Sequence, residues 1–339
     1  MEAGLCDTWV LPPCISVPLL EVSRRLELPP VLTYAASNLW NFTRSGKDFS
    51  DLDNIHTIHT FTGTEDESWF FMVSVAMEAK AGYAIPTMVR AVEAAKTGDY
   101  GTVIDALKKL KGCIEQVGEL LERMYERSDP SVFFNQIRPY LAGSKNMADA
   151  GLPRGVFYDE GDGKGKWMQL RGGSNGQSSL IQFFDIVLGV EHASQGNSTP
   201  HTRSLSSKTL PQPSFHDEVR DYMPGPHRRF LEYIKHTGSI RDFAMQPLDT
   251  PEHIKLRNAY TNAVDTLSEF RTKHIRLVTR YIVLPSQQEV STQRQNLATA
   301  SAQGHRDDQG LTGTGGTLLL PFLKQSRDET SDAANLHAG

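Results

Sequence analysis

The sequence predicts an all-α fold, and three observations lead to this prediction. Apolar residues recur at intervals of three and four along most of the 339 residues, which is the period of a helix with one buried face. The alternating patterns that are typical of strands are scarce. Hydrophobic residues make up 39% of the chain and charged residues 22%, an ordinary balance for a globular protein, so a packed helical core is feasible. A chain of this length can form one large domain and a smaller one.

The first strong helical signals lie before residue 128. Residues 67–84 form one predicted helix, which Pro86 interrupts. Pro86 is expected to begin a second helix, and Gly98 is expected to end it. Residues 99–127 predict a long helix with a single apolar stripe. The stripe consists of Val103, Leu107, Leu110, Ile114, Val117, Leu121 and Met124.

Two further helices are predicted by their boundaries and composition. Asp129 is a suitable N-cap for the next helix, Pro130 suits its first position, and Gly143 is a suitable stop. Residues 178–190 form a short, strongly apolar helix after a polar, glycine-rich loop. In between, residues 159–163 are acidic and contain two glycines; they indicate a hairpin turn, since the spaced ligands of a calcium loop are missing.

The longest predicted helix covers residues 251–281. Thr250 can cap it, Pro251 suits its first position, and the apolar run before Pro285 stops it. Its apolar stripe consists of Leu256, Tyr260, Ala263, Leu267, Phe270, His274, Leu277 and Tyr281. The intervals alternate between four and three, so His274 points where core residues point.

Charge, cysteine content and hydropathy exclude several classes of protein. The formal net charge of −5 is spread along the chain, without the clustered basic face of a nucleic-acid-binding protein. Three cysteines in a chain this long do not form a disulfide framework, so we expect reduced thiols and a cytoplasmic protein. The first residues lack the pattern of a secretory signal, and no apolar run is long enough for a membrane helix.

His274 has two interpretations. A lone histidine in an apolar stripe is more often a structural residue that is bonded to a carbonyl oxygen. The alternative is an axial ligand of a heme iron, because an imidazole from a buried helix is the usual proximal donor. Arg271, one turn earlier, could then meet a heme propionate or a carboxylate that orients it, and Asp185 is a candidate for that carboxylate. For any single arginine, an ordinary surface residue is the commoner case.

A second set of residues suits an aromatic amino acid. Phe70 and Ser74 share one side of a helix. Phe133 and Arg138 lie about 140° apart on an ideal helix, so they border one pocket only if the helix bends, for which Pro139 offers a reason. Rings beside an arginine and a hydroxyl could bind an indole ring and its carboxylate. Spacing alone favours the plainer alternative, ordinary core packing and a salt bridge.

Several motifs, taken together, resemble the indoleamine 2,3-dioxygenase family, in its fungal type. Their order and approximate spacing fit as well, over roughly residues 8–325. The motifs are LELPPVLTYA (26–35), FFMVS (70–74), the pair Phe133-Phe134 with Arg138, GGSNGQSS (172–179), RDYMP with His227 and Arg228 (220–228), Arg271 with His274, VTRY (278–281) and GTGGT (313–317).

The resemblance implies a large helical domain that holds heme b and a small N-terminal helical domain over its distal side. In this chain we expect residues 1–62 to be a shortened remnant of the small domain and residues 63–325 to form the large one. Residues 194–214 and 286–312 are rich in small polar residues and are expected to be flexible loops. Residues 326–339 are expected to be a disordered tail.

The resemblance also implies roles for the matched residues. His274 is the expected proximal ligand of the heme iron. The expected cofactor-binding residues are Arg271, Gly173, Ser174 and Asp185, the last as the partner of Arg271. The expected substrate-binding residues are Tyr34, Phe70, Ser74, Phe133, Arg138, Ser174 and Thr314.

The implied reaction opens the indole ring of L-tryptophan with O2 and gives N-formyl-L-kynurenine, in the kynurenine route of tryptophan catabolism toward NAD. No side chain is expected to act as a general acid or base. L-Tryptophan and O2 are the expected partners, without nucleic acid or membrane, and the protein is expected to be a monomer. One alternative is a heme-binding relative with little or no activity and a sensory or regulatory role. Another is a helical scaffold without a cofactor.

Overall fold

The computed structural model describes residues 9–148, 151–193, 214–287, 311, 313–314 and 318–335. Helices account for 63% and strands for 8%, so the predicted all-α class is confirmed. The α-helices are α1 (Pro13–Leu26), α2 (Glu65–Ala81), α3 (Ala84–Lys96), α4 (Tyr100–Glu122), α5 (Met124–Arg127), α6 (Pro130–Val132), α7 (Arg138–Leu141), α8 (Ser179–Leu188), α9 (Phe215–Arg220), α10 (Gly225–Thr237), α11 (Arg241–Ala244), α12 (Pro251–Val278), α13 (Leu284–Ser286) and α15 (Leu319–Asp332).

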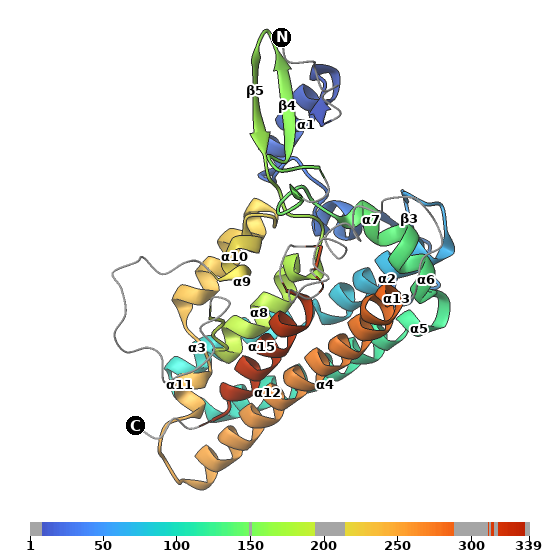
Figure 1. Cartoon of the computed structure of the whole chain (residues 1–339). Coiled ribbons are helices and arrows are strands. Elements are labelled where there is room, and N and C mark those ends of the chain that lie inside the picture. The colour runs from blue at the N-terminus through green and yellow to red at the C-terminus, as the bar shows by residue number, and fades with distance from the viewer. Residues whose placement is uncertain are drawn as a thin grey trace.

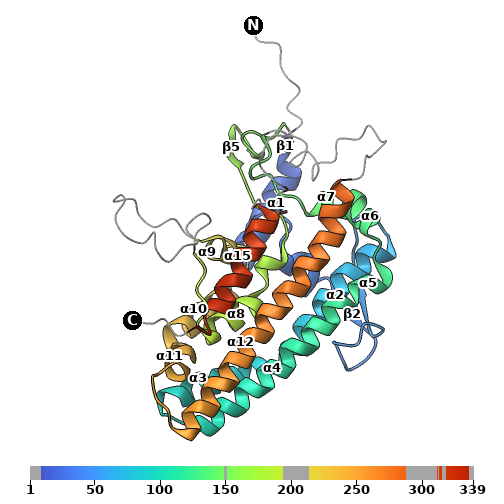
Figure 2. The ribbon, with the colours of Figure 1, turned by 60° about the horizontal axis from the view of Figure 1, so that its bottom comes forward.

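The long helices α4 and α12 run side by side along the helical body (Figure 2). Every member of the stripe predicted for residues 99–127 is buried, and most of the α12 stripe is buried as well. α2 and α3 pack on α4, and α15 packs on α12. The apolar faces that the sequence predicts therefore meet in one core, and burial of such faces is the main force that stabilises a helical fold.

The predicted helix caps are confirmed where they were proposed. The Asp129 side chain accepts from the backbone N–H groups of Ser131 and Val132, at 2.8 and 3.1 Å. The Thr250 hydroxyl accepts from the backbone of His253 at 3.2 Å and caps α12. Each bond satisfies an N–H group that has no partner inside its helix.

A small sheet next to α1 projects from the helical body (Figure 1). β4 (Val156–Gly161) and β5 (Lys164–Met168) form an antiparallel hairpin, so the turn predicted at residues 159–163 is confirmed. β1 (Val10–Leu11) pairs in parallel with β4. A separate two-stranded sheet joins β2 (Phe42–Arg44) and β3 (Ile55–Thr57). The N-terminal segment is thus completed by strands from far along the chain, while the division into two domains stays a prediction.

Two boundaries differ from the prediction. The chain does not stop being helical before Pro285, because a π-helical turn and the short helix α13 follow α12 directly, and Pro285 lies in the first turn of α13, where it is tolerated. The expected tail at residues 326–339 is wrong for its first part, which continues α15 to Asp332. Ser326 and Thr330 are buried there, so polar side chains dock this half of the helix.

The two predicted flexible loops lie mostly outside the described residues. At their edges, Ser214 caps α9 with a reciprocal capping box, and Ser286 belongs to α13. None of the helices in the described part of the chain combines the length and the apolarity that crossing a membrane requires.

Candidate functional site

A cavity lies beside the C-terminal half of α12 and collects residues from distant parts of the chain. About 120 Å³ of it is open to the centres of water molecules. Most of the residues predicted to bind cofactor or substrate line it, and these are Tyr34, Phe70, Phe133, Arg138, Gly173, Ser174, His274 and Thr314. Three predicted residues do not line it. Ser74 interacts with Tyr34 but does not reach the cavity, and Arg271 and Asp185 belong to a separate buried cluster.

Three π-helical turns border this cavity. They are η1 (Ala35–Leu39), η2 (Phe133–Ile137) and η6 (Thr279–Val283). In η2 the backbone N–H of Arg138 donates to the carbonyl of Phe133, five residues earlier. This wider turn brings the fifth residue close to the face of the first, so both side chains reach one cavity. The bend expected at Pro139 is therefore replaced by a π turn just before it.

The aromatic wall of the cavity is packed ring against ring. The ring centroids of Phe70 and Phe133 are 4.9 Å apart with planes at 58°, and Phe133 meets the edge of Tyr281 at 5.8 Å. The Tyr281 hydroxyl donates to the carbonyls of Met124 and Ser128, at 2.9 and 2.8 Å. These contacts hold the wall rigidly, and its apolar faces suit a flat aromatic ligand.

His274 faces the cavity from α12. Burial, with a smaller effect from the Arg271 charge, lowers the pKa of His274 to about 4, so its imidazole is neutral at neutral pH. Within the described residues no hydrogen bond reaches this ring. A structural histidine would be bonded to a carbonyl oxygen, as a buried polar group usually requires. A neutral imidazole that borders a cavity without such a bond has the chemistry of a metal ligand instead.

Arg138 brings a positive charge to the same cavity. Only 2% of the residue is exposed, and its guanidinium lies over the ring of Phe134, 5.5 Å from the centroid. Burial lowers the pKa of Arg138 to about 10, which leaves it charged at neutral pH. A buried cation at the edge of an aromatic cavity is suited to bind a carboxylate, for which the planar guanidinium offers two parallel donors.

Tyr34, at the floor of the cavity, contacts a partly buried carboxyl group that the sequence analysis missed. The hydroxyls of Tyr34 and Ser178 donate to Glu78 Oε1, at 3.0 and 2.6 Å. Burial raises the pKa of Glu78, and burial next to this carboxylate raises the pKa of Tyr34 well above its ordinary value. Glu78 follows Ser74 by four residues on α2. This spacing puts both side chains on one side of the helix and could have indicated Glu78 from the sequence.

The glycine-rich loop after residue 171 is held tightly against the rest of the site. A Cβ atom on Gly172 would lie 2.0 Å from the carbonyl oxygen of Leu141, so only glycine fits there. Gln177 donates to the carbonyl of Gly172 at 2.8 Å and accepts from the backbone of Tyr34 at 2.9 Å. The Thr314 hydroxyl donates to the carbonyl of Gly173 at 2.8 Å. Thr314 and the loop thus close one side of the cavity together.

Arg271 and Asp185 form a buried ion pair outside the cavity. Arg271 Nη2 lies 2.9 and 2.8 Å from the two carboxylate oxygens, and the side chains are 9% and 6% exposed. Burial would raise the pKa of Asp185, but the charges of Arg271 and His192 lower it below its usual range. Arg271 was expected to meet either a heme propionate or a carboxylate that orients it. The structure shows the second contact, with the carboxylate of Asp185.

Comparisons with known proteins agree with one another. Residues 3–333 match the family model described as indoleamine 2,3-dioxygenase. An indoleamine 2,3-dioxygenase of Saccharomyces cerevisiae is 39% identical over 96% of this chain and 73% of its own length. One of Aspergillus nanangensis is also 39% identical, over 96% of this chain and 75% of that protein. A 6-hydroxytryptophan 2,3-dioxygenase of Fusarium equiseti is 36% identical, over 95% and 75%.

Proposed function

Because the chain belongs to the indoleamine 2,3-dioxygenase family, a family of heme-dependent dioxygenases, we propose that it opens the indole ring of L-tryptophan with O2 and forms N-formyl-L-kynurenine. The product enters the kynurenine route of tryptophan catabolism. We further propose a cytoplasmic monomer, and the free thiols of Cys14 and Cys113 are consistent with a reducing compartment. The name of the Fusarium relative makes 6-hydroxytryptophan the competing substrate to test.

The observation that carries this proposal is the state of His274. A neutral, partly buried imidazole that faces a cavity has the chemistry of an iron ligand, and His274 would hold the heme iron from α12. Gly173 and Ser174 border the same cavity, where the loop could follow the edge of the heme. Heme b, when bound, supplies the redox chemistry with O2.

The remaining residues of the cavity bind and orient the substrate. The rings of Phe70 and Phe133 pack on the indole, and Arg138 binds the carboxylate. Ser174 and Thr314 offer oxygen atoms for the ammonium group. Among the described residues that line the cavity there is no Asp or Glu. We assign these side chains to positioning and electrostatics, and correct orientation alone can supply much of a rate enhancement.

The test is to express the full chain with hemin and to follow product formation from L-tryptophan under reducing conditions in air. We expect a Soret band and O2-dependent formation of N-formyl-L-kynurenine. A parallel assay with 6-hydroxytryptophan measures the preference between the two substrates. A chain that is loaded with heme but acts on neither substrate would support the inactive, sensory alternative and would contradict the proposal.

Ser74→Ala should leave substantial activity. The Ser74 side chain is 6% exposed and interacts with Tyr34, whose hydroxyl remains bonded to Glu78 when Ser74 is lost. One neutral hydrogen bond contributes about 0.5–1.5 kcal/mol, so kcat/KM should fall by no more than about tenfold. Steady-state kinetics beside the control Ser45→Ala, at an exposed loop position, measures this. A loss of several hundredfold would show that Ser74 acts directly on the substrate.

A further inference from the structure

A cluster of four largely buried charged side chains lies outside the cavity, about one turn along α12 from His274. It continues from the Arg271–Asp185 pair. His192 Nε2 lies 3.2 Å from Asp185 Oδ2, and His192 Nδ1 lies 2.7 Å from Glu329 Oε2 on α15. The His192 side chain is 8% exposed and Glu329 16%. The cluster therefore joins α8, the segment after it, α12 and α15 through two cations and two anions.

The geometry shows which state His192 adopts. Both ring nitrogens face carboxylate oxygens, which only accept hydrogen bonds when ionised, so the form with a proton on each nitrogen satisfies both contacts. The ring that fits this geometry is therefore an imidazolium cation, which is the form below its raised pKa. The direction of its pKa agrees: burial would lower the pKa of His192, but the Asp185 charge and the bonds to both carboxylates outweigh burial and raise it. Coulombic repulsion from Arg271 is a smaller, opposing effect.

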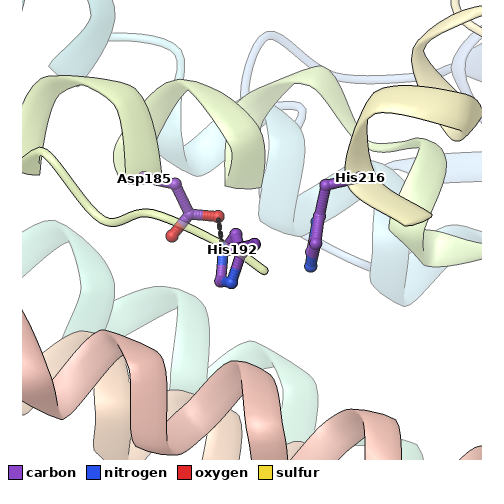
Figure 3. A group of neighbouring side chains, drawn as sticks. All are labelled: Asp185, His192 and His216. Carbon is purple, nitrogen blue, oxygen red and sulfur yellow. Dashed lines mark hydrogen bonds and ion pairs between the residues drawn. The ribbon is translucent and has the colours of Figure 1, made fainter. Parts of the chain in front are cut away.

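His216 on α9 is the neutral imidazole beside this cation. Its ring stacks on that of His192, with centroids 3.9 Å apart and planes at 18° (Figure 3). Burial, then the charge of His192, lowers the pKa of His216 well below its ordinary value, and Arg271 and Arg220 add to this effect. One protonated and one neutral ring can stack without repulsion, which two imidazolium cations could not.

The same three side chains, Asp185, His192 and His216, are close enough to suggest a metal site. The arrangement argues against one. An ion must lie in the plane of each imidazole that ligates it, and two nearly parallel rings 3.9 Å apart do not share such a point. Asp185 is already engaged by Arg271. The cluster is thus a set of ion pairs in the present geometry.

The position of Glu329 gives the cluster a connection to the cavity. Leu319, ten residues earlier on α15, lines the cavity. The helix spans about 15 Å between these residues, at about 1.5 Å per residue, and a helix transmits position over that distance as a rigid element. Arg271 contacts the same helix by donating to Thr330. The docking of one end of α15 therefore sets where its other end meets the cavity.

We propose that the protonated imidazole of His192, held between Asp185 and Glu329, is a clasp that docks α15 and so positions Leu319 at the cavity. His192 is a positioning residue, and it makes the docking depend on pH. A histidine with a raised pKa stabilises the fold fully below the ordinary value and loses this effect as the pH rises through the raised value. Protons reach the ring from a polar cleft of about 510 Å³ that His192 and His216 line. Only the effect on the substrate rests on the proposed function.

The test measures amide hydrogen exchange of residues 319–332 in the full, heme-loaded chain from pH 6 to pH 9. Peptides from residues 103–121 in the core of α4 serve as the internal reference at each pH. In His192→Gln, exchange of α15 should be about tenfold faster or more at pH 6, as expected when a charge-assisted hydrogen bond is lost. The unaltered chain should approach this variant as the pH rises. His236→Gln, at a position whose side chain is 73% exposed, is the matched control.

Glu329→Gln provides a second variant, which should show the same loss at low pH, and the double variant should be no worse than either single one. KM for the substrate should rise in both, with a smaller change in kcat. Equal protection of α15 in His192→Gln and the unaltered chain at every pH would overturn the clasp. So would one equivalent of zinc that is bound by the dialysed protein and lost in His216→Ala. The exchange experiment needs no substrate, so an inactive enzyme would leave this inference standing.

Discussion

Replacing His274 by alanine should leave a folded chain that retains no heme. The His274 imidazole is neutral, borders the cavity and has no hydrogen bond within the described residues, so it suits an iron ligand. Removing a proximal ligand removes the bond that fixes the iron. The absorption spectrum after expression with hemin and gel filtration measures the effect, and we expect the Soret band to disappear while the helical circular dichroism stays.

The control for this variant is another buried histidine on the same helix. His253 is fully buried near the start of α12, next to the Tyr100 hydroxyl at 3.4 Å, and does not line the cavity. His253→Ala should lower stability but keep the Soret band. Added imidazole should restore heme binding to His274→Ala, because the cavity left by the side chain can hold it. Normal heme retention by His274→Ala would refute the assignment of the iron ligand.

Much of the helical framework could be predicted because the spacing of apolar residues along the chain indicates which face of each helix is buried. The stripe of residues 99–127 and that of residues 251–281 both became core, and the caps Asp129 and Thr250 formed as expected. The shared face of α12 placed His274 toward the interior. These predictions rest on local spacing, which a straight helix converts directly into direction.

The predictions failed where direction or docking depends on something other than apolar spacing. A π turn shifts every later residue around the helix axis, so the angle between Phe133 and Arg138 could not be read from an ideal helix. The second half of α15 packs on the fold through the polar residues Ser326, Glu329 and Thr330. A helix face made of polar residues looks like a solvated tail in the sequence, so this half was wrongly predicted to be disordered. The strands β4 and β5 are short and partly exposed, so their alternation is weak.

The site was predictable residue by residue only through the family resemblance. Spacing alone favoured a structural histidine and an ordinary core, and no local pattern joins Tyr34 to His274 across the chain. The fold adds what the motifs lacked. Glu78 accepts a hydrogen bond from the Tyr34 hydroxyl and holds that ring in place. The hydrogen bond from Thr314 to the carbonyl of Gly173 closes one side of the cavity. Such supporting residues determine how precisely a site is held, and they are scattered because packing, not sequence proximity, brings them together.

Arg138→Ala should cost far more in substrate use than in heme binding. Arg138 is 2% exposed, remains charged and lines the cavity beside the aromatic wall, on elements other than α12. Truncating one partner of a buried, charge-assisted pair typically costs about 2–5 kcal/mol, which corresponds to a fall in kcat/KM of roughly 30- to 5,000-fold. The Soret band should stay, because His274, the proposed iron ligand, lies on another helix. Steady-state kinetics with L-tryptophan measures the loss.

Two comparisons separate lost carboxylate binding from a damaged pocket. Tryptamine has the same indole and ammonium groups but no carboxylate, so Arg138→Ala should use it about as well as the unaltered chain does. Arg138→Lys should recover only part of the activity with L-tryptophan, because a single ammonium group cannot form the two parallel bonds of a guanidinium. If tryptamine use falls as far as tryptophan use, Arg138 holds the cavity together by its packing on Phe134 instead. The carboxylate would then have to be bound by another group.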